Sequence, residues 1–132
     1  MRLVLTALIF LAGMFDLFLA ISFLTGPQQA AAGFGLSPTG TGGLSTLRAD
    51  MTAFFGVAAF CMLWGAWRRN ADLLLVPILL FGTAMVARLI NVVVAGPYDG
   101  WPVPVAVEAF HVVLLLIGWR TLPHHRIDEI AG

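Results

Sequence analysis

Three ionisable residues, Asp16, Arg88 and Glu108, lie inside three different hydrophobic segments of the sequence. A charge at the centre of a bilayer costs roughly 3 kcal/mol on insertion scales, so chains that keep such charges usually bury, pair and use them. With a helical rise of ~1.5 Å per residue, all three lie ~10–12 Å from the same end of the bundle. The sequence therefore predicts a buried polar layer, with Glu108 and Asp16 as candidate general acids or bases.

Other polar residues fall near the same depth. Glu108 and His111 are three residues apart, and so are Arg88 and Asn91, so each pair shares one helix face. The carboxylates of this layer outnumber its guanidiniums, and such an uneven buried set suits acid–base chemistry or proton coupling. The residues predicted to bind a ligand are Arg48, Asp50, Arg88, Asn91 and His111.

A structural role is the competing interpretation. Arg88 paired with Glu108 or with Asp16 would simply hold helices together, and a lone His111 is more often a hydrogen-bonded core residue. Asp16 is the hardest to explain in this way, because an unpaired buried aspartate needs either a proton or a partner from another helix. We expect Arg88 to be that partner.

The composition indicates which elements position these residues. The chain has 132 residues, of which 60% are hydrophobic and 11% are charged, against roughly a quarter charged in soluble domains. This is the composition of an integral membrane domain, and the net charge of zero argues against a nucleic-acid partner. The single Cys61 excludes a cysteine metal site, and the adjacent His124 and His125 form no preorganised one. No metal and no cofactor is expected.

Four segments are long enough to cross a bilayer, which takes ~20 apolar residues. The sequence predicts an all-α fold, an integral membrane bundle of four transmembrane helices, with one domain over residues 1–122 and a polar cytoplasmic tail over 123–132. The first segment is too long an apolar run for a cleaved signal peptide. The loop before the second segment contains a short predicted helix from Pro27 that ends at Gly33. The predicted transmembrane helices cover about 3–24, 47–67, 73–95 and 101–122.

The distribution of arginine predicts the topology. Four spans place both termini and the 68–72 connection on one side, and this side holds five of the seven arginines. By the positive-inside rule that side is cytoplasmic, so both termini are predicted inside. The predicted location is the bacterial inner (cytoplasmic) membrane, crossed several times. The five arginines are Arg2, Arg68, Arg69, Arg120 and Arg126.

The second predicted span opens with Leu47, Arg48 and Ala49, and Arg88 and Glu108 follow in the third and fourth spans. In this pattern, over about residues 3–122, the chain resembles a family of small bacterial four-helix membrane proteins known only as a domain of unknown function. The resemblance implies a four-helix bundle and no particular activity.

The predicted function is the binding of a small lipophilic or amphipathic molecule, with its transformation by acid–base chemistry as an extension. The pocket is expected in the outer half of the bundle, lined by Phe54, Phe55, Met85 and Phe110. A small proton-coupled transporter is one alternative, and a non-catalytic accessory or scaffold protein is another. The expected partners are the lipid bilayer and the lipophilic molecule, and assembly as a homo-oligomer stays open.

Overall fold

The regular structure of the described chain is helical. The computed structural model describes residues 2–124. Four of its helices are long and apolar enough to cross a membrane, when the short 3₁₀ turn before α4 is counted with α4. The elements are α1 (Arg2–Thr25), α2 (Pro27–Gly33), α3 (Gly40–Arg68), the 3₁₀ turn η1 (Asp72–Leu74), α4 (Leu75–Ala95) and α5 (Pro102–Thr121).

The helix bounds follow the predicted spans except at the start of α3. The short helix α2 is confirmed, and Pro27 and Pro102 begin α2 and α5, where a missing N–H costs little. The helix α3 begins at Gly40 instead of Leu47. Glycine and threonine are poor helix formers, but a helix already nucleated by its apolar part gains one hydrogen bond for each residue added. The Gly43 amide accordingly donates to the Thr39 carbonyl at 3.2 Å.

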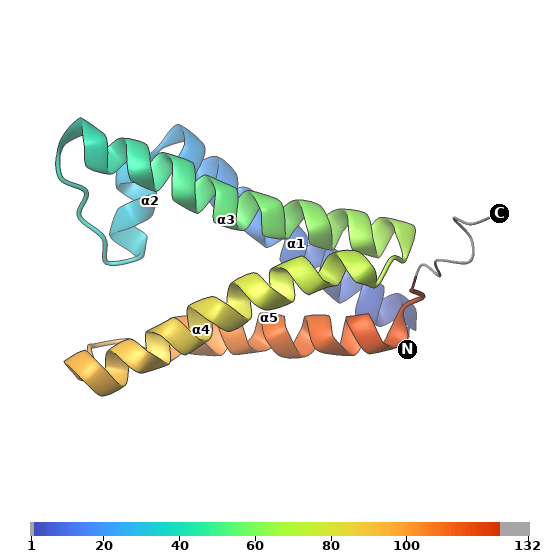
Figure 1. Ribbon diagram of the computed structural model, residues 1–132. Helices are drawn as coiled ribbons and strands as arrows, with labels where there is room; N and C mark the ends of the chain where they lie inside the picture. The colour runs from blue at the N-terminus through green and yellow to red at the C-terminus, as the bar shows by residue number, and fades with distance from the viewer. Residues whose placement is uncertain (1, 125–132) are drawn as a thin grey trace, which may run out of the picture.

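The long helices form two pairs, α1 with α3 and α4 with α5. Figure 1 shows that the pairs lie close together at the end that carries the N-terminus and the α3–α4 connection, and that they diverge toward α2 and the α4–α5 connection. Glycine permits the close approach within the first pair. A Cβ atom on Gly13 would lie 3.1 Å from Met62 Cβ and from Leu63 Cγ. We refer below to the end where the pairs meet as the closed end and to the other as the open end.

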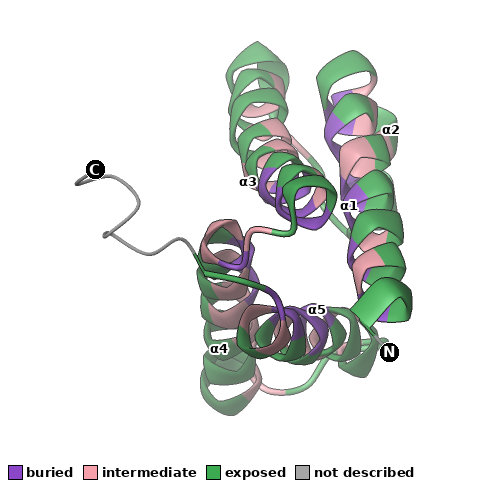
Figure 2. Cartoon of the chain, turned by 90° about the vertical axis from the view of Figure 1, so that its right-hand side faces the viewer, coloured by how far each residue is buried: buried purple, intermediate pink, exposed green. Residues whose placement is uncertain are grey.

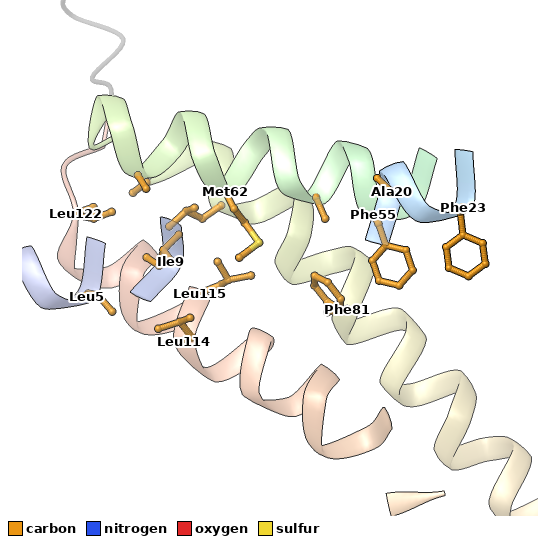
Figure 3. Packing of buried hydrophobic residues seen from close by; sticks show 14 of the residues in the cluster. Leu5, Ile9, Ala20, Phe23, Phe55, Met62, Phe81, Leu114, Leu115 and Leu122 are labelled. Atoms are coloured by element: carbon orange, nitrogen blue, oxygen red, sulfur yellow. The ribbon is translucent and has the colours of Figure 1, made fainter. Parts of the chain in front are cut away.

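The hydrophobic core fills the closed end between the two pairs (Figure 3). Ile9, Met62 and Leu115 come from three different helices, and none of them is exposed. Toward the open end the core continues as an aromatic cluster that joins α1, α3 and the residue after α2. There the Phe23 ring lies 6.1 Å from Phe55 and 5.2 Å from Phe34.

The outward faces of the helices are apolar and exposed, while the buried residues face the neighbouring helices (Figure 2). Trp67 is 75% exposed and Val93 is 84% exposed. In water such a continuous apolar surface would drive association, whereas against lipid tails its exposure costs little. The surface therefore agrees with four membrane-spanning helices.

The chain after α5 is fixed to the α3–α4 connection. The Ala71 amide donates to the Pro123 carbonyl at 2.9 Å, and His124 Nδ1 lies 2.8 Å from Asp72 Oδ1. Of the polar tail predicted over 123–132, the first two residues are thus held against the bundle, and His124 is not simply solvated. The remainder, with His125 and Arg126, lies outside the described residues.

Candidate functional site

Arg88 and Glu108 join the second helix pair. They lie on α4 and α5, and Arg88 Nε donates to both carboxylate oxygens of Glu108, at 3.1 and 3.3 Å. Arg88 Nη2 donates to Oε1 at 2.9 Å, and Nη1 reaches the Tyr98 hydroxyl at 3.4 Å. Glu108 is buried, and such a two-pronged pair satisfies it fully. We therefore interpret this pair as one that stabilises the contact between α4 and α5.

Asp16 and His111 form a second pair, between α1 and α5. Their Oδ2 and Nε2 atoms lie 3.4 Å apart, and both side chains are almost fully buried. The two atoms lie within reach of each other but are not aligned for a well-formed hydrogen bond, so both Asp16 oxygens and His111 Nε2 lack a hydrogen bond of good geometry among the described residues. Groups of this kind are rare in native proteins and usually indicate a bound water, a ligand or a catalytic role.

The contact between His111 and the Val107 carbonyl indicates where the protons of this pair lie. His111 Nδ1 lies 2.8 Å from the Val107 carbonyl, which only accepts hydrogen bonds, so we assign a proton to Nδ1. Two arrangements then suit the facing atoms, a carboxylate with an imidazolium or a carboxylic acid with a neutral imidazole. In both arrangements the pair carries one proton on Nδ1 and a second on either Nε2 or an Asp16 oxygen.

Aromatic rings hold the imidazole in place. The Phe81 ring stacks on His111 at 4.1 Å between centroids, and Phe110 meets it edge-on at 5.8 Å. Phe81 is itself almost fully buried. The ring of His111 therefore has little freedom to turn away from Asp16.

A groove with a volume of about 580 Å³ runs between α1 and α5, and His111 forms part of its wall. The rest of the wall is apolar. On α1 it includes Ala12 and Phe15, the second of which directly precedes Asp16 in the chain, and on α5 it includes Val107 and Phe110. We call this the α1–α5 groove. It brings an apolar surface next to the incompletely satisfied pair.

The structure divides the predicted polar layer instead of assembling it. The expectation that Arg88 would pair with Asp16 is wrong, because α4 packs against α5 and not against α1 within the described chain. Arg48 is exposed and donates to the Leu24 carbonyl at 3.0 Å. Asp50 and Asn91 are exposed and make no hydrogen bond or ion pair with any described residue.

Three of the four residues predicted to line the pocket, Phe54, Phe55 and Met85, do not line the α1–α5 groove. Phe54 packs edge-on against Phe55 at 5.1 Å and against Phe81 at 5.4 Å, so these rings contact each other rather than a ligand space. Of the predicted lining residues, Phe110 does line the α1–α5 groove, and Met85 does not. In the sequence, a phenylalanine of the core looks the same as a phenylalanine that lines a pocket. Only the packing of the helices shows which of the two it is.

Sequence reasoning missed two residues that support the pairs, Tyr98 and Phe81. Tyr98 lies ten residues after Arg88, beyond the end of α4, and the chain turns back there to bring the hydroxyl to Nη1. Phe81 belongs to α4, while the imidazole that it stacks on belongs to α5. Phe81 also offers no signal in the sequence, because it is one of ten phenylalanines.

Within residues 2–124 no group of three or more His, Cys, Asp or Glu side chains is placed to hold a metal ion. No protein-family model, curated protein or solved structure matches the chain. The resemblance to an uncharacterised four-helix family therefore stays a prediction, and the site must be interpreted from its own geometry.

Proposed function

We propose that this protein binds a small lipophilic or amphipathic molecule in the α1–α5 groove, with the polar end of the molecule at the Asp16–His111 pair. One observation carries the proposal: His111 forms part of the wall of an apolar groove, and its Nε2 atom faces the buried Asp16 without a well-formed hydrogen bond. The groove volume of about 580 Å³ lies within the ~300–1,000 Å³ typical of small-molecule sites.

The energetics favour a ligand with a hydroxyl or carbonyl group. A buried polar atom without a partner costs ~1–3 kcal/mol, so a ligand group that reaches His111 Nε2 or an Asp16 oxygen recovers part of this cost. The apolar body of the ligand would lie along Phe15 and Phe110. The Asp16–His111 pair would then orient the ligand, and the apolar contacts in the groove would provide most of its binding affinity.

Acid–base transformation of the ligand is the extension of this proposal. A proton on Asp16 or on His111 Nε2 could move to a ligand group within hydrogen-bond reach, and the unprotonated form could accept one. Of the two acids predicted from the sequence, we assign this role to Asp16. Glu108 already accepts three hydrogen bonds from Arg88, so we assign Glu108 a positioning role.

We further propose that the protein resides in the bacterial inner membrane with its closed end in the cytoplasm. The support is the arginine distribution, since Arg2, Arg68, Arg69 and Arg120 all lie at that end. Asp16 then lies ~13 Å below the outer end of α1. No observation favours proton-coupled transport, because the fully buried Ile9, Met62 and Leu115 occupy the core of the closed end.

The test is mass spectrometry of the small molecules and lipids that co-purify with the protein in native nanodiscs. We expect the wild-type protein to retain a molecule that Asp16→Asn and His111→Gln lose. The matched control is Asp50→Asn, which makes the same chemical change on an exposed residue without a partner and should retain the molecule. Equal retention by all four proteins would contradict the proposal and favour a scaffold role.

A second variant addresses the groove without touching the pair. Ala106 is exposed and lines the α1–α5 groove, so Ala106→Phe should block it while leaving the fold intact. We expect the co-purifying molecule to be lost from this variant at an unchanged unfolding temperature. Retention at wild-type level would show that the molecule binds elsewhere.

A further inference from the structure

A second apolar groove lies on another face of α1, against α3 instead of α5. Its volume is about 480 Å³, and its wall includes Phe10 and Leu17 from α1 and Gly56, Phe60, Trp64 and Trp67 from α3. None of these residues lines the α1–α5 groove. We call it the α1–α3 groove.

The length of this groove matches one leaflet of a bilayer. From Gly56 to Trp67 the helix rises ~16 Å, and the hydrocarbon core of a bilayer is ~30 Å thick. The Trp67 end lies next to the last residue of α3, and the Gly56 end lies near the middle of the span. A single acyl chain that enters at the closed end would therefore run the full length of the groove.

Positive charge gathers at the mouth of the groove. Arg68 follows Trp67, and its guanidinium carbon lies 5.8 Å from the centroid of the Trp64 ring. Arg68 is exposed, as are Arg2, Arg69 and Arg120 at the same end. Asp72 is the one carboxylate among the described residues at this end, and it is engaged with His124. The mouth therefore complements a negatively charged group.

We propose that the α1–α3 groove binds an anionic phospholipid, with one acyl chain along Phe60 and Gly56 and the phosphate at Arg68. A guanidinium suits phosphate because it donates two parallel hydrogen bonds. The stacking of Phe60 on Trp64, at 6.1 Å between centroids, gives the chain a flat wall. This site is separate from the proposed ligand site and does not depend on it.

Native mass spectrometry in nanodiscs of equal parts phosphatidylglycerol and phosphatidylcholine, with the same acyl chains, tests the charge requirement. We expect the wild type to retain phosphatidylglycerol preferentially and Arg68→Gln to lose about fivefold of that preference, the factor that corresponds to ~1 kcal/mol for one direct contact between exposed opposite charges. The conservative Arg68→Lys should keep a part of it. The matched control Arg120→Gln, at the same end on α5, should keep all of it.

Two results would overturn the proposal. One is an unchanged preference in Arg68→Gln, and the other is an equal loss in Arg120→Gln, which would reduce the effect to the general charge of this end. Both arginines are exposed at helix ends, so these variants are expected to fold.

A second pair of variants tests the acyl-chain part. A Cβ on Gly56 would lie 3.7 Å from Ala20 Cβ, an ordinary contact, so Gly56→Leu is expected to fold while filling the inner end of the groove. Its control is Val57→Leu, on the adjacent residue outside the groove. We expect Gly56→Leu to lower retention of long-chain phosphatidylglycerol, and Val57→Leu to leave it unchanged. Equal retention in the two variants would exclude the groove as the site of the acyl chain.

Discussion

The two buried acid–base pairs of this bundle differ in how completely their polar atoms are hydrogen-bonded. Arg88 and Glu108 satisfy each other through three hydrogen bonds, so their charges are held in place. Asp16 and His111 face each other at 3.4 Å and leave three polar atoms without hydrogen bonds. Satisfied pairs stabilise helix contacts, whereas incompletely satisfied pairs are available to a ligand. This difference is why the proposed ligand site is placed at the second pair and a stabilising role is expected for the first.

Removing one partner of the first pair should destabilise the fold. Glu108→Gln leaves the Arg88 guanidinium without its counter-charge, and we expect a loss of ~1–3 kcal/mol, less than for a fully buried pair because Arg88 is one-third exposed. Equilibrium unfolding in detergent measures this loss. The control Asp99→Asn removes the same charge from an exposed residue at the open end and should change little. A loss as large in the control would indicate a general charge effect.

A double-variant cycle isolates the interaction itself. If the contact carries the loss, Arg88→Met combined with Glu108→Gln should be less destabilising than the sum of the two single variants. Additive losses would show that the two side chains stabilise the fold separately.

At this scale the sequence predicted the burial of Asp16 and Glu108, but it did not predict that Asp50 and Asn91 are exposed or that Asp16 pairs with His111. The depths of Asp16 and Glu108 follow from counting along single helices, and both are buried in the structure. Pairing depends on which helices are neighbours, and nothing in the spacing indicates that α1 packs on α5 while α4 does not reach it. A contact between helices distant in sequence has no signal in one sequence.

Among the helices, the start of α3 has the sequence that is least favourable for helix formation. Gly40, Gly42 and Gly43 lie within its first turn, where glycine loses the most conformational entropy on folding. We expect the amides of this turn to exchange hydrogen faster than those in the rest of α3, because few buried contacts hold the turn in place.

Two alanine substitutions in this turn should have opposite effects. A Cβ on Gly42 would meet no atom within 4 Å, so Gly42→Ala should stabilise the protein by ~0.5–1 kcal/mol. Gly40 has a φ of +63°, which alanine adopts only with strain, so Gly40→Ala should give no gain or a loss. Thermal unfolding distinguishes the two variants. Equal effects would mean that this turn is not helical under the conditions of measurement.

The contact between α1 and α3 depends on the absence of a side chain at Gly13. Alanine there gains helix propensity, but its Cβ would lie 3.1 Å from Met62 Cβ, and the helices must separate slightly. Gly82→Ala, which has no atom closer than 4.0 Å, gains the propensity without the crowding. We expect Gly13→Ala to be ~1–2 kcal/mol less stable than Gly82→Ala in unfolding experiments. A smaller difference would show that the α1–α3 contact adjusts freely.

At the scale of the whole molecule, the closed end carries Arg2, Arg68, Arg69 and Arg120, and the open end carries α2 and the α4–α5 connection (Figure 1). The number of spans and the grouping of chain ends could be predicted from apolar length and arginine positions alone. The divergence of the two pairs could not, because it depends on the packing of side chains such as Ile9 and Leu115 between them.

Cysteine labelling tests the predicted orientation. In a Cys61→Ala background, Ser37→Cys and Asp99→Cys at the open end should react with a membrane-impermeant maleimide in intact cells. Asn70→Cys at the closed end should react only after permeabilisation, because the positive-inside rule places that end in the cytoplasm. The reverse pattern would place both termini outside, and labelling of all three in intact cells would indicate mixed insertion.

The arrangement of two helix pairs joined at one end has a mechanical consequence. The α4 helix is ~31 Å long, so a tilt of ~5° about the packed core at the closed end would move its far tip by ~3 Å. Such a displacement is comparable to the thickness changes to which membrane helices respond by tilting. We therefore expect the distance between the open ends of the two helix pairs to vary with the thickness of the surrounding bilayer.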